Sequence, residues 1–126
     1  MIFVLYSLNS RSCKRVISFF RTHQISFNRI LLGKDPVPIQ LIKDILELTF
    51  DGYEEIFSFK TQAFLRLNIS KNKLFEMHTN EVLELLSRDS ELLKRPIVFQ
   101  YDKFNKPLRL MVGYDNEEIE IFLRDE

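Results

Sequence analysis

The feature that most constrains the fold is an uninterrupted apolar run near the start of the chain, Ile-Phe-Val-Leu-Tyr at residues 2–6. A strand buried on both faces has this pattern, and such strands occur in parallel sheets that helices cover. Asn9 or Ser10 is a candidate N-cap for an amphipathic helix that reaches about His23. A second strand is expected over residues 26–32. Together these elements predict a β-α-β unit with a right-handed crossover.

The middle of the chain predicts helices. Pro38 occupies the favoured first position of a helix that the Asp51-Gly52 pair is expected to end. Short helical pieces without a clear period follow over residues 53–77. Thr79 or Asn80 is then expected to cap a helix that carries apolar residues at 82, 83, 85 and 86, and a short turn follows at Leu92-Leu93. Residues 34–94 are therefore expected to form a helical insert.

A change of hydrophobic period marks the last part of the chain. Apolar runs at 97–99 and 108–112, joined by a polar loop, predict a β-hairpin, and Asp115 is expected to begin a last helix. The Arg95-Pro96 pair stands directly before the first of these strands, where a proline cannot donate a ladder hydrogen bond. On the sequence alone, a cis and a trans peptide bond are both open at this position.

The order of the expected elements is β-α-β, a helical insert, then β-β-α. It predicts an α/β fold of thioredoxin-like design, in which helices flank a four-stranded mixed sheet. We expect a single domain over residues 1–126, whose thioredoxin-like core, 1–33 and 95–126, encloses the helical insert 34–94. A chain of 126 residues with 45% apolar residues can bury such a core without a disulfide or a metal.

The charge distribution limits the classes of partner. The formal net charge is zero, which argues against a protein that grips nucleic acid by neutralising phosphates alone. We expect no direct sequence-specific DNA binding by this chain on its own. Residues 1–50 carry seven Lys or Arg and three Asp or Glu, whereas residues 51–126 carry eleven and fifteen. This asymmetry is either ordinary solvated surface or a positive face for an acidic partner or a small oxyanion.

Several other classes of protein are not expected. No apolar stretch approaches the roughly 20 residues of a membrane span, and the start of the chain lacks the pattern of a secretory signal. The single cysteine excludes a disulfide framework and a Cys-cluster zinc site, and the two histidines do not complete a metal site. We therefore expect a cytoplasmic protein with no membrane contact, no metal and no cofactor.

A cysteine stands at the start of the first helix, which is the reactive position in the thioredoxin layout. Backbone N–H groups at a helix N-terminus favour the thiolate there. The usual device is Cys-x-x-Cys, but the tetrad here is Ser10-Arg11-Ser12-Cys13, so no intramolecular disulfide can form. Cys13 is either a small packed residue or a thiol that reacts with glutathione or a partner protein. Ser10 is either a helix cap or a nucleophile, and neither histidine lies in a triad spacing that favours a nucleophile.

Lys60 and Arg95 are candidates for holding an anion near the N-terminus of the first helix. On spacing alone, two separate surface charges fit equally well. Pro96 belongs to the same candidate site, because thioredoxin-like folds place a proline before a strand opposite the cysteine helix.

Several segments together resemble the Spx and arsenate reductase (ArsC) family, and they run in order through nearly the whole chain. Arg95-Pro96-Ile97 and Val112-Gly113-Tyr114 are fairly specific as a pair. The matching segments are the strand ending in Tyr6, Ser10-Arg11-Ser12-Cys13-Lys14-Arg15, Ile42-Lys43-Asp44-Ile45-Leu46, Asp51-Gly52-Tyr53-Glu54-Glu55-Ile56, Phe64-Leu65-Arg66-Leu67-Asn68, Leu92-Leu93-Lys94-Arg95-Pro96-Ile97, Val112-Gly113-Tyr114, Glu118-Ile119 and Phe122-Leu123.

The resemblance implies two functional branches. Arsenate reductases use one catalytic cysteine at the first position of the tetrad, and that position here is Ser10, which speaks against arsenate reduction. Spx proteins are transcription regulators that bind the C-terminal domain of the RNA polymerase α subunit. In that branch the glycine matching Gly52 lies at the polymerase contact, with Asp51 and Tyr53 beside it.

The same resemblance assigns roles to two cations. The arginine matching Arg95 interacts with the oxidised redox corner of Spx proteins. Lys60 stands where the family has an arginine. The positive charge is kept, but a lysine cannot bind an anion through the two parallel hydrogen bonds of a guanidinium group. The loop before the tetrad is one residue shorter than in the family, and the hairpin loop is longer. Because the sequence ends at Glu126, soon after the last expected helix, we do not expect the tail through which Spx proteins reach the ClpXP protease.

The leading hypothesis is a Spx-like regulator that docks on RNA polymerase α and is blind to disulfide stress. The alternative is an enzyme, a thiol reductase linked to glutathione or glutaredoxin that uses Cys13; the missing first cysteine argues against it. A third hypothesis is a redox-inert module that competes with a two-cysteine paralogue for the same partner.

Overall fold

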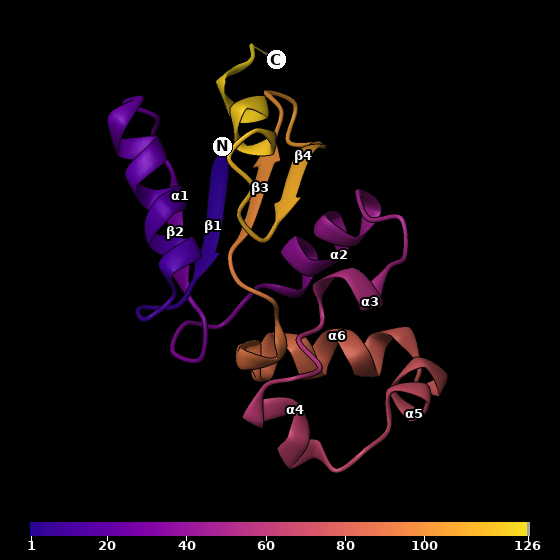
Figure 1. The fold of residues 1–126 in the computed structure, drawn as a ribbon. Helices are drawn as coiled ribbons and strands as arrows, with labels where there is room; N and C mark the ends of the chain where they lie inside the picture. The colour runs from indigo at the N-terminus through magenta and orange to yellow at the C-terminus, as the bar shows by residue number, and fades with distance from the viewer. Residues whose placement is uncertain (126) are drawn as a thin grey trace.

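A four-stranded sheet in the order β2-β1-β3-β4 forms the centre of the computed structural model, which describes residues 1–125 (Figure 1). β1 pairs in parallel with β2 and antiparallel with β3, and β3 pairs antiparallel with β4. The predicted mixed sheet is therefore confirmed. The strands are β1 (Ile2–Tyr6), β2 (Asn28–Leu31), β3 (Ile97–Tyr101) and β4 (Pro107–Val112).

The helices follow the predicted order. One helix connects β1 to β2, a run of short helices separates β2 from β3, and a 3-10 helix follows β4 where a last helix was expected. In Figure 1 the helices between β2 and β3 lie below and to the right of the sheet. The bounds are α1 (Arg11–Thr22), α2 (Ile39–Glu47), α3 (Tyr53–Ile56), α4 (Gln62–Leu67), α5 (Lys71–Glu76), α6 (Thr79–Arg88), and the 3-10 helices η1 (Ser90–Leu92) and η2 (Glu118–Leu123).

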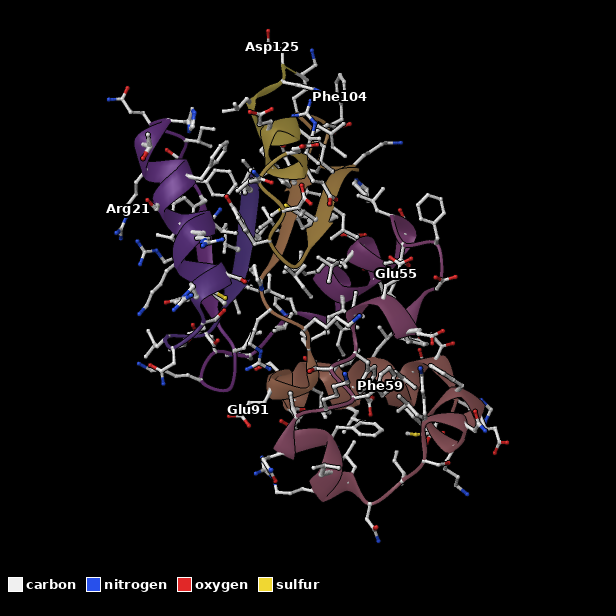
Figure 2. The ribbon with its side chains drawn as sticks, viewed as in Figure 1. Arg21, Glu55, Phe59, Glu91, Phe104 and Asp125 are labelled. Atoms are coloured by element: carbon white, nitrogen blue, oxygen red, sulfur yellow. The ribbon has the colours of Figure 1, made fainter. Side chains whose placement is uncertain are left out.

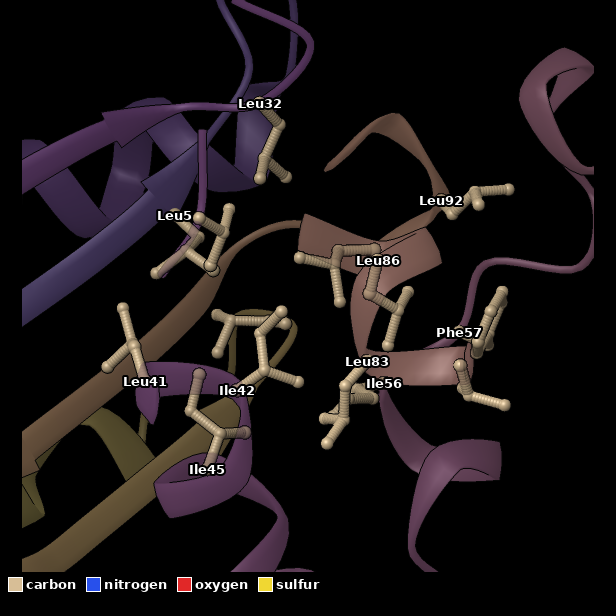
Figure 3. Packing of buried hydrophobic residues seen from close by; sticks show 14 of the residues in the cluster. Leu5, Leu32, Leu41, Ile42, Ile45, Ile56, Phe57, Leu83, Leu86 and Leu92 are labelled. Carbon is tan, nitrogen blue, oxygen red and sulfur yellow. The ribbon is translucent and has the colours of Figure 1, made fainter. Parts of the chain in front are cut away.

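Each face of the sheet buries its own hydrophobic cluster, because successive side chains of a strand point to opposite faces. Val4 of β1 and Val98 of β3 pack with Phe20 of α1 and Phe122 of η2. On the other face Leu5, together with its strand neighbours, packs against α2, α6 and η1 (Figure 3). Each fully buried large side chain contributes about 1.5–3 kcal/mol to folding. The two clusters hold the ends of β1 and β3, and hence the candidate site, in fixed positions.

The helix after Pro38 is shorter than predicted. Pro38 is its N-cap rather than its first residue, and α2 ends at Glu47, well before Gly52. The hydroxyl of Thr49 donates a 2.7 Å hydrogen bond to the carbonyl of Leu46, so a carbonyl at the helix end is satisfied early. Gly52 is instead the N-cap of α3. The expectation that Asp51-Gly52 ends this helix was wrong, because the Thr49 hydroxyl binds a carbonyl of the last helical turn before the chain reaches Gly52.

Within residues 1–125, every helix falls short of the length and apolar character that crossing a bilayer requires. The same residues contain no cluster of three or more His, Cys, Asp or Glu that could hold a metal ion.

Candidate functional site

Ser10 is the N-cap of α1. Its backbone is extended, with φ −88° and ψ 122°, and its Oγ accepts a 3.2 Å hydrogen bond from the backbone N–H of Cys13. One of the first-turn N–H groups, which have no partner inside the helix, is satisfied in this way. The hydroxyl therefore has a structural role at the position where a Cys-x-x-Cys motif carries its first thiol.

Cys13 is buried directly behind this cap. Only 1% of the residue is exposed, and its Sγ accepts a 3.5 Å hydrogen bond from the backbone N–H of Ser7. Ser7 follows the end of β1, so the thiol lies between the strand end and the first turn of α1. A reagent can reach the sulfur only if this corner opens.

Pro96 lies at the same end of the sheet as this corner. Leu5 pairs with Ile97, so the residues just beyond them, Tyr6 and Pro96, are neighbours. The Arg95-Pro96 peptide bond is cis, and Pro96 is buried. The cis alternative left open by the sequence is therefore confirmed, and the expectation that this proline belongs near the cysteine helix agrees with the strand register.

Arg95 turns toward its own segment. Its Nη2 donates to the backbone carbonyls of Glu91 and Leu93, the latter at 2.9 Å. With Lys94 and Glu55 it lines a cavity of about 610 Å³. Cys13 does not line that cavity.

Lys60 is exposed in the turn before α4. Within the described residues no hydrogen bond or ion pair joins it to Arg95, and it lines neither the Arg95 cavity nor the cavity beside Cys13. The structure thus brings Ser10, Cys13 and Pro96 to one end of the sheet and leaves Lys60 outside this group.

A second cavity, of about 390 Å³, lies beside Cys13 between α1, the end of β1 and Arg29 of β2. Its lining includes Lys14, Arg21 and Arg29, three cations that the sequence analysis did not group together. Their side chains come from two elements, and only the packing of α1 on the sheet brings them around one space.

The predicted polymerase contact is a surface loop at residues 50–53, which we call the 50–53 loop. Oε1 of Glu55 accepts hydrogen bonds from the backbone N–H groups of Phe50 and Asp51, at 2.7 and 2.8 Å. Gly52 has φ 64° and ψ −131°, a conformation that essentially only glycine adopts. The hydroxyl of Tyr53 donates to the carbonyl of Thr79 at 3.5 Å.

Two residues of this loop region were missed by the sequence analysis. Phe50 is 99% exposed, the most exposed of the large apolar residues described. The available signal for an exposed aromatic is the apolar residue directly before Asp51-Gly52, but the helix expected to end at Asp51-Gly52 includes this residue. Glu55 closes the loop, and a carboxylate in the first turn of a helix is a known partner for orphan N–H groups.

The loop and the cysteine corner belong to different elements, the start of α3 and the start of α1. In Figure 2 the helix α1, with Arg21 labelled near its end, and Glu55 of α3 lie on opposite sides of the strands. A docking surface at the loop and chemistry at Cys13 would therefore use different elements.

Three side chains among residues 1–125 have clearly shifted pKa values. Burial, reinforced by a hydrogen bond to Asp44, raises the pKa of Tyr101. The Lys71 ammonium beside Glu54 lowers the pKa of that carboxyl. Hydrogen bonds from the backbone N–H groups of Glu118 and Glu117 lower the pKa of Asp115. The N-cap of η2 is Glu117, two residues after the Asp115 at which the sequence predicted the start of the last helix.

Comparisons with known proteins agree with the family resemblance found in the sequence. The model of the ArsC family matches residues 5–122. An uncharacterized protein of Ureaplasma parvum is 46% identical over 124 residues, which cover 98% of this chain and 96% of that protein. The global transcriptional regulator Spx of Lactiplantibacillus plantarum is 37% identical over 121 residues, which cover 95% of this chain and 85% of the regulator.

A solved structure, that of a possible arsenate reductase from Streptococcus mutans, has the same fold. Its TM-score is 0.73 at 24% identity, with 92% of each chain covered. The family match takes in the cysteine corner, the 50–53 loop and the cis-proline strand. The chain belongs to the ArsC family.

Proposed function

We propose that this protein is a Spx-like transcription regulator that docks through the 50–53 loop on the C-terminal domain of the RNA polymerase α subunit. The similarity to a global transcriptional regulator, at 37% identity over most of both chains, supports the regulatory branch of the family. The proposal places the protein in the cytoplasm, where bacterial RNA polymerase acts. The polymerase supplies the grip on DNA, so a net charge of zero is sufficient.

The observation that carries this proposal is the geometry of Gly52. A Cβ built at Gly52 has no heavy atom within 4 Å, so the space in front of the loop is open. Beside it, the Phe50 ring is almost fully exposed, and Glu55 holds the loop backbone in place. A preformed loop with an exposed aromatic ring is the kind of surface that forms the centre of a protein interface.

The state of the cysteine corner supports a docking protein over an enzyme. Ser10 uses its hydroxyl as a helix cap, and Cys13 is buried with 1% of its surface exposed. The chain has one cysteine, so an intramolecular disulfide switch is absent from the proposed mechanism.

Titration of the isolated α C-terminal domain with this protein tests the proposal. We expect saturable binding that Phe50→Ala weakens by about tenfold, since a central aromatic contributes more than 1 kcal/mol. Phe104→Ala is the matched control, because Phe104 is also exposed, at 70%, but lies in the hairpin loop. Equal effects of the two variants would contradict docking through the 50–53 loop.

A second pair of variants separates the loop backbone from the side-chain surface. Gly52→Ala and Gly52→Arg both force an L-residue into the glycine conformation, so they share the backbone strain. Only Gly52→Arg adds a long charged side chain to the open space. We expect Gly52→Arg to bind the α domain at least tenfold more weakly than Gly52→Ala, and equal affinities would remove Gly52 from the contact.

The second candidate function is a glutathione- or glutaredoxin-linked thiol reductase. One observation favours it, since Cys13 lines a cavity together with Lys14 and Arg29, which could hold an anionic thiol. The test is turnover of a mixed disulfide substrate with glutathione and glutaredoxin, in the native protein and in Cys13→Ala. The regulator proposal predicts no turnover above background in either protein, and turnover lost in Cys13→Ala would establish the reductase instead.

A further inference from the structure

The cavity of about 390 Å³ between α1 and β2 differs from the other cavities of this protein in its charge. We call it the α1–β2 groove, and the polar side chains that line it and carry the argument are Ser7, Lys14, Ser18, Arg21, Thr22 and Arg29. Its size falls in the range of small-molecule sites. No Asp or Glu lines it, whereas the three other cavities described include Asp44, Glu55 or Asp115.

The three cations of the groove come together from two elements. Lys14, Ser18 and Arg21 are spaced four and three residues apart on α1, so they share one face of the helix. Arg29 on β2 pairs with Val4, whose side chain packs toward α1, and residues paired across a sheet point to the same face. In Figure 2 the Arg21 side chain extends outward from α1.

None of these cations is neutralised inside the protein. The ion pairs found among residues 1–125 are Arg66–Glu91 and Lys71–Glu54, and neither involves the groove. The guanidinium of Arg29 lies 5.3 Å from the ring centroid of Phe27, which leaves its charge uncompensated. Three like charges around one cavity repel one another, and an anion in the cavity removes that repulsion.

The cavity on the other side of α1 provides a contrast. It shares Ser18 and Thr22 with the groove, but Arg15 is the one arginine in its lining, and Asp115 is also in that lining. The cavity beside Arg95 likewise contains Glu55. Of the four cavities described among residues 1–125, the α1–β2 groove alone combines several cations with hydroxyl donors and no carboxylate.

The chemistry of the lining specifies the class of ligand. Guanidinium groups bind phosphate through two parallel hydrogen bonds, and an ammonium and hydroxyls add single donors. Lys14 and Arg21 are separated along the helix axis by about 10 Å at 1.5 Å per residue, which exceeds the width of one phosphate. The apolar side chains of Leu8 and Ile17 also line the groove, and they can pack against an uncharged part of the ligand.

We propose that the α1–β2 groove binds a small organic phosphate with more than one phosphate group, of the size of a nucleoside diphosphate. The site excludes Lys60 and Arg95, and it does not depend on docking to RNA polymerase. Cys13 also lines the groove, but only 1% of it is exposed, so the phosphate site does not require the thiol.

The test is a titration of the ¹⁵N-labelled full chain, in low salt, with ADP, with pyrophosphate and with adenosine. We expect saturable shifts of the Ser7, Ser18 and Thr22 amides with ADP, weaker saturable binding of pyrophosphate, and none of adenosine. Arg21→Ala and Arg29→Ala should each weaken ADP binding about tenfold, since each removes a charge-assisted hydrogen bond.

Arg11→Ala is the matched control, because Arg11 is exposed on the same helix and lines neither cavity of α1. It should change ADP affinity by less than about twofold. If Arg11→Ala weakened ADP binding as much as Arg21→Ala and Arg29→Ala do, ADP would be attracted only by the general positive charge of residues 1–50. That result would overturn the proposed site. Binding of adenosine as tight as that of ADP, or no saturable shift with ADP at roughly 5 mM, would overturn it as well.

Discussion

The cysteine corner and the 50–53 loop of this protein have opposite characters. The corner is closed, since Ser10 caps α1 and Cys13 is buried behind it. The loop is open, since Gly52 faces empty space and Phe50 is 99% exposed. Family members that do chemistry need the first region accessible, whereas a docking protein needs the second. The scaffold is intact with a serine at the first tetrad position, and under the proposed function its use shifts from chemistry to surface recognition.

The largest effect that tests this contrast is the protection of the Cys13 thiol. We expect Cys13 to react roughly 100-fold more slowly with a neutral thiol reagent in the folded protein than in urea, because reaction requires local opening of the corner. The rates are measured by stopped-flow absorbance or by mass spectrometry. A folded-state rate within a few-fold of the unfolded rate would show that the corner is open and would break the comparison.

The order of the 50–53 loop depends on a single carboxylate. Glu55→Ala removes the acceptor for the Phe50 and Asp51 N–H groups, so their amide hydrogens should exchange about tenfold faster. Glu54→Ala is the matched control on the same helix, and its own partner is Lys71. If both variants left the two amides unchanged, Glu55 would not be what preforms the loop.

The helix cap at the corner has a measurable stability. Ser10→Ala should lower the free energy of unfolding by about 1 kcal/mol, and Ser10→Gly by only a few tenths, because glycine is tolerated as an N-cap. Ser12→Ala, two residues along the same helix turn, should change stability by less than about 0.5 kcal/mol. Urea denaturation measures all three. An unchanged free energy of unfolding in Ser10→Ala would contradict the helix-capping role of this hydroxyl.

The smallest effect concerns the surface next to the loop. Lys71 holds the pKa of Glu54 below its ordinary value of 4.5. A lowered folded-state pKa means that the contribution to stability is present above that ordinary value and is lost as the pH falls through the folded-state pKa. In Lys71→Met the NMR titration midpoint of Glu54 should rise toward 4.5, whereas Lys73→Met should leave it in place. An unchanged midpoint in Lys71→Met would contradict the pairing.

Much of the fold was predictable from local patterns. The apolar run at 2–6 predicted β1, Ser10 was one of two candidate caps of α1, and the change of period after Pro96 predicted the hairpin. These features depend on neighbouring residues only. The end of α2 was not predicted, because the hydroxyl of Thr49 competes with glycine as a terminator, and propensity does not decide between them.

The candidate site was predictable only where sequence order determines spatial order. Pro96 directly precedes a strand, and analogy with thioredoxin-like folds places it with the corner; the register of β3 on β1 agrees with that position. Lys60 and Arg95 are far apart in the sequence, and the orientation of Arg95 is set by the carbonyls of Glu91 and Leu93. The grouping of Lys14, Arg21 and Arg29 likewise required the packing of α1 on the sheet. No sequence period encodes such contacts.

The most direct test of the central claim is the affinity for the polymerase α domain under reducing and oxidising conditions. A protein that docks through a preformed loop and has no disulfide partner for Cys13 should bind with the same Kd, within about twofold, in a reductant and after treatment with a thiol oxidant. Binding that appears only after oxidation, or no saturable binding at roughly 100 μM, would contradict the account.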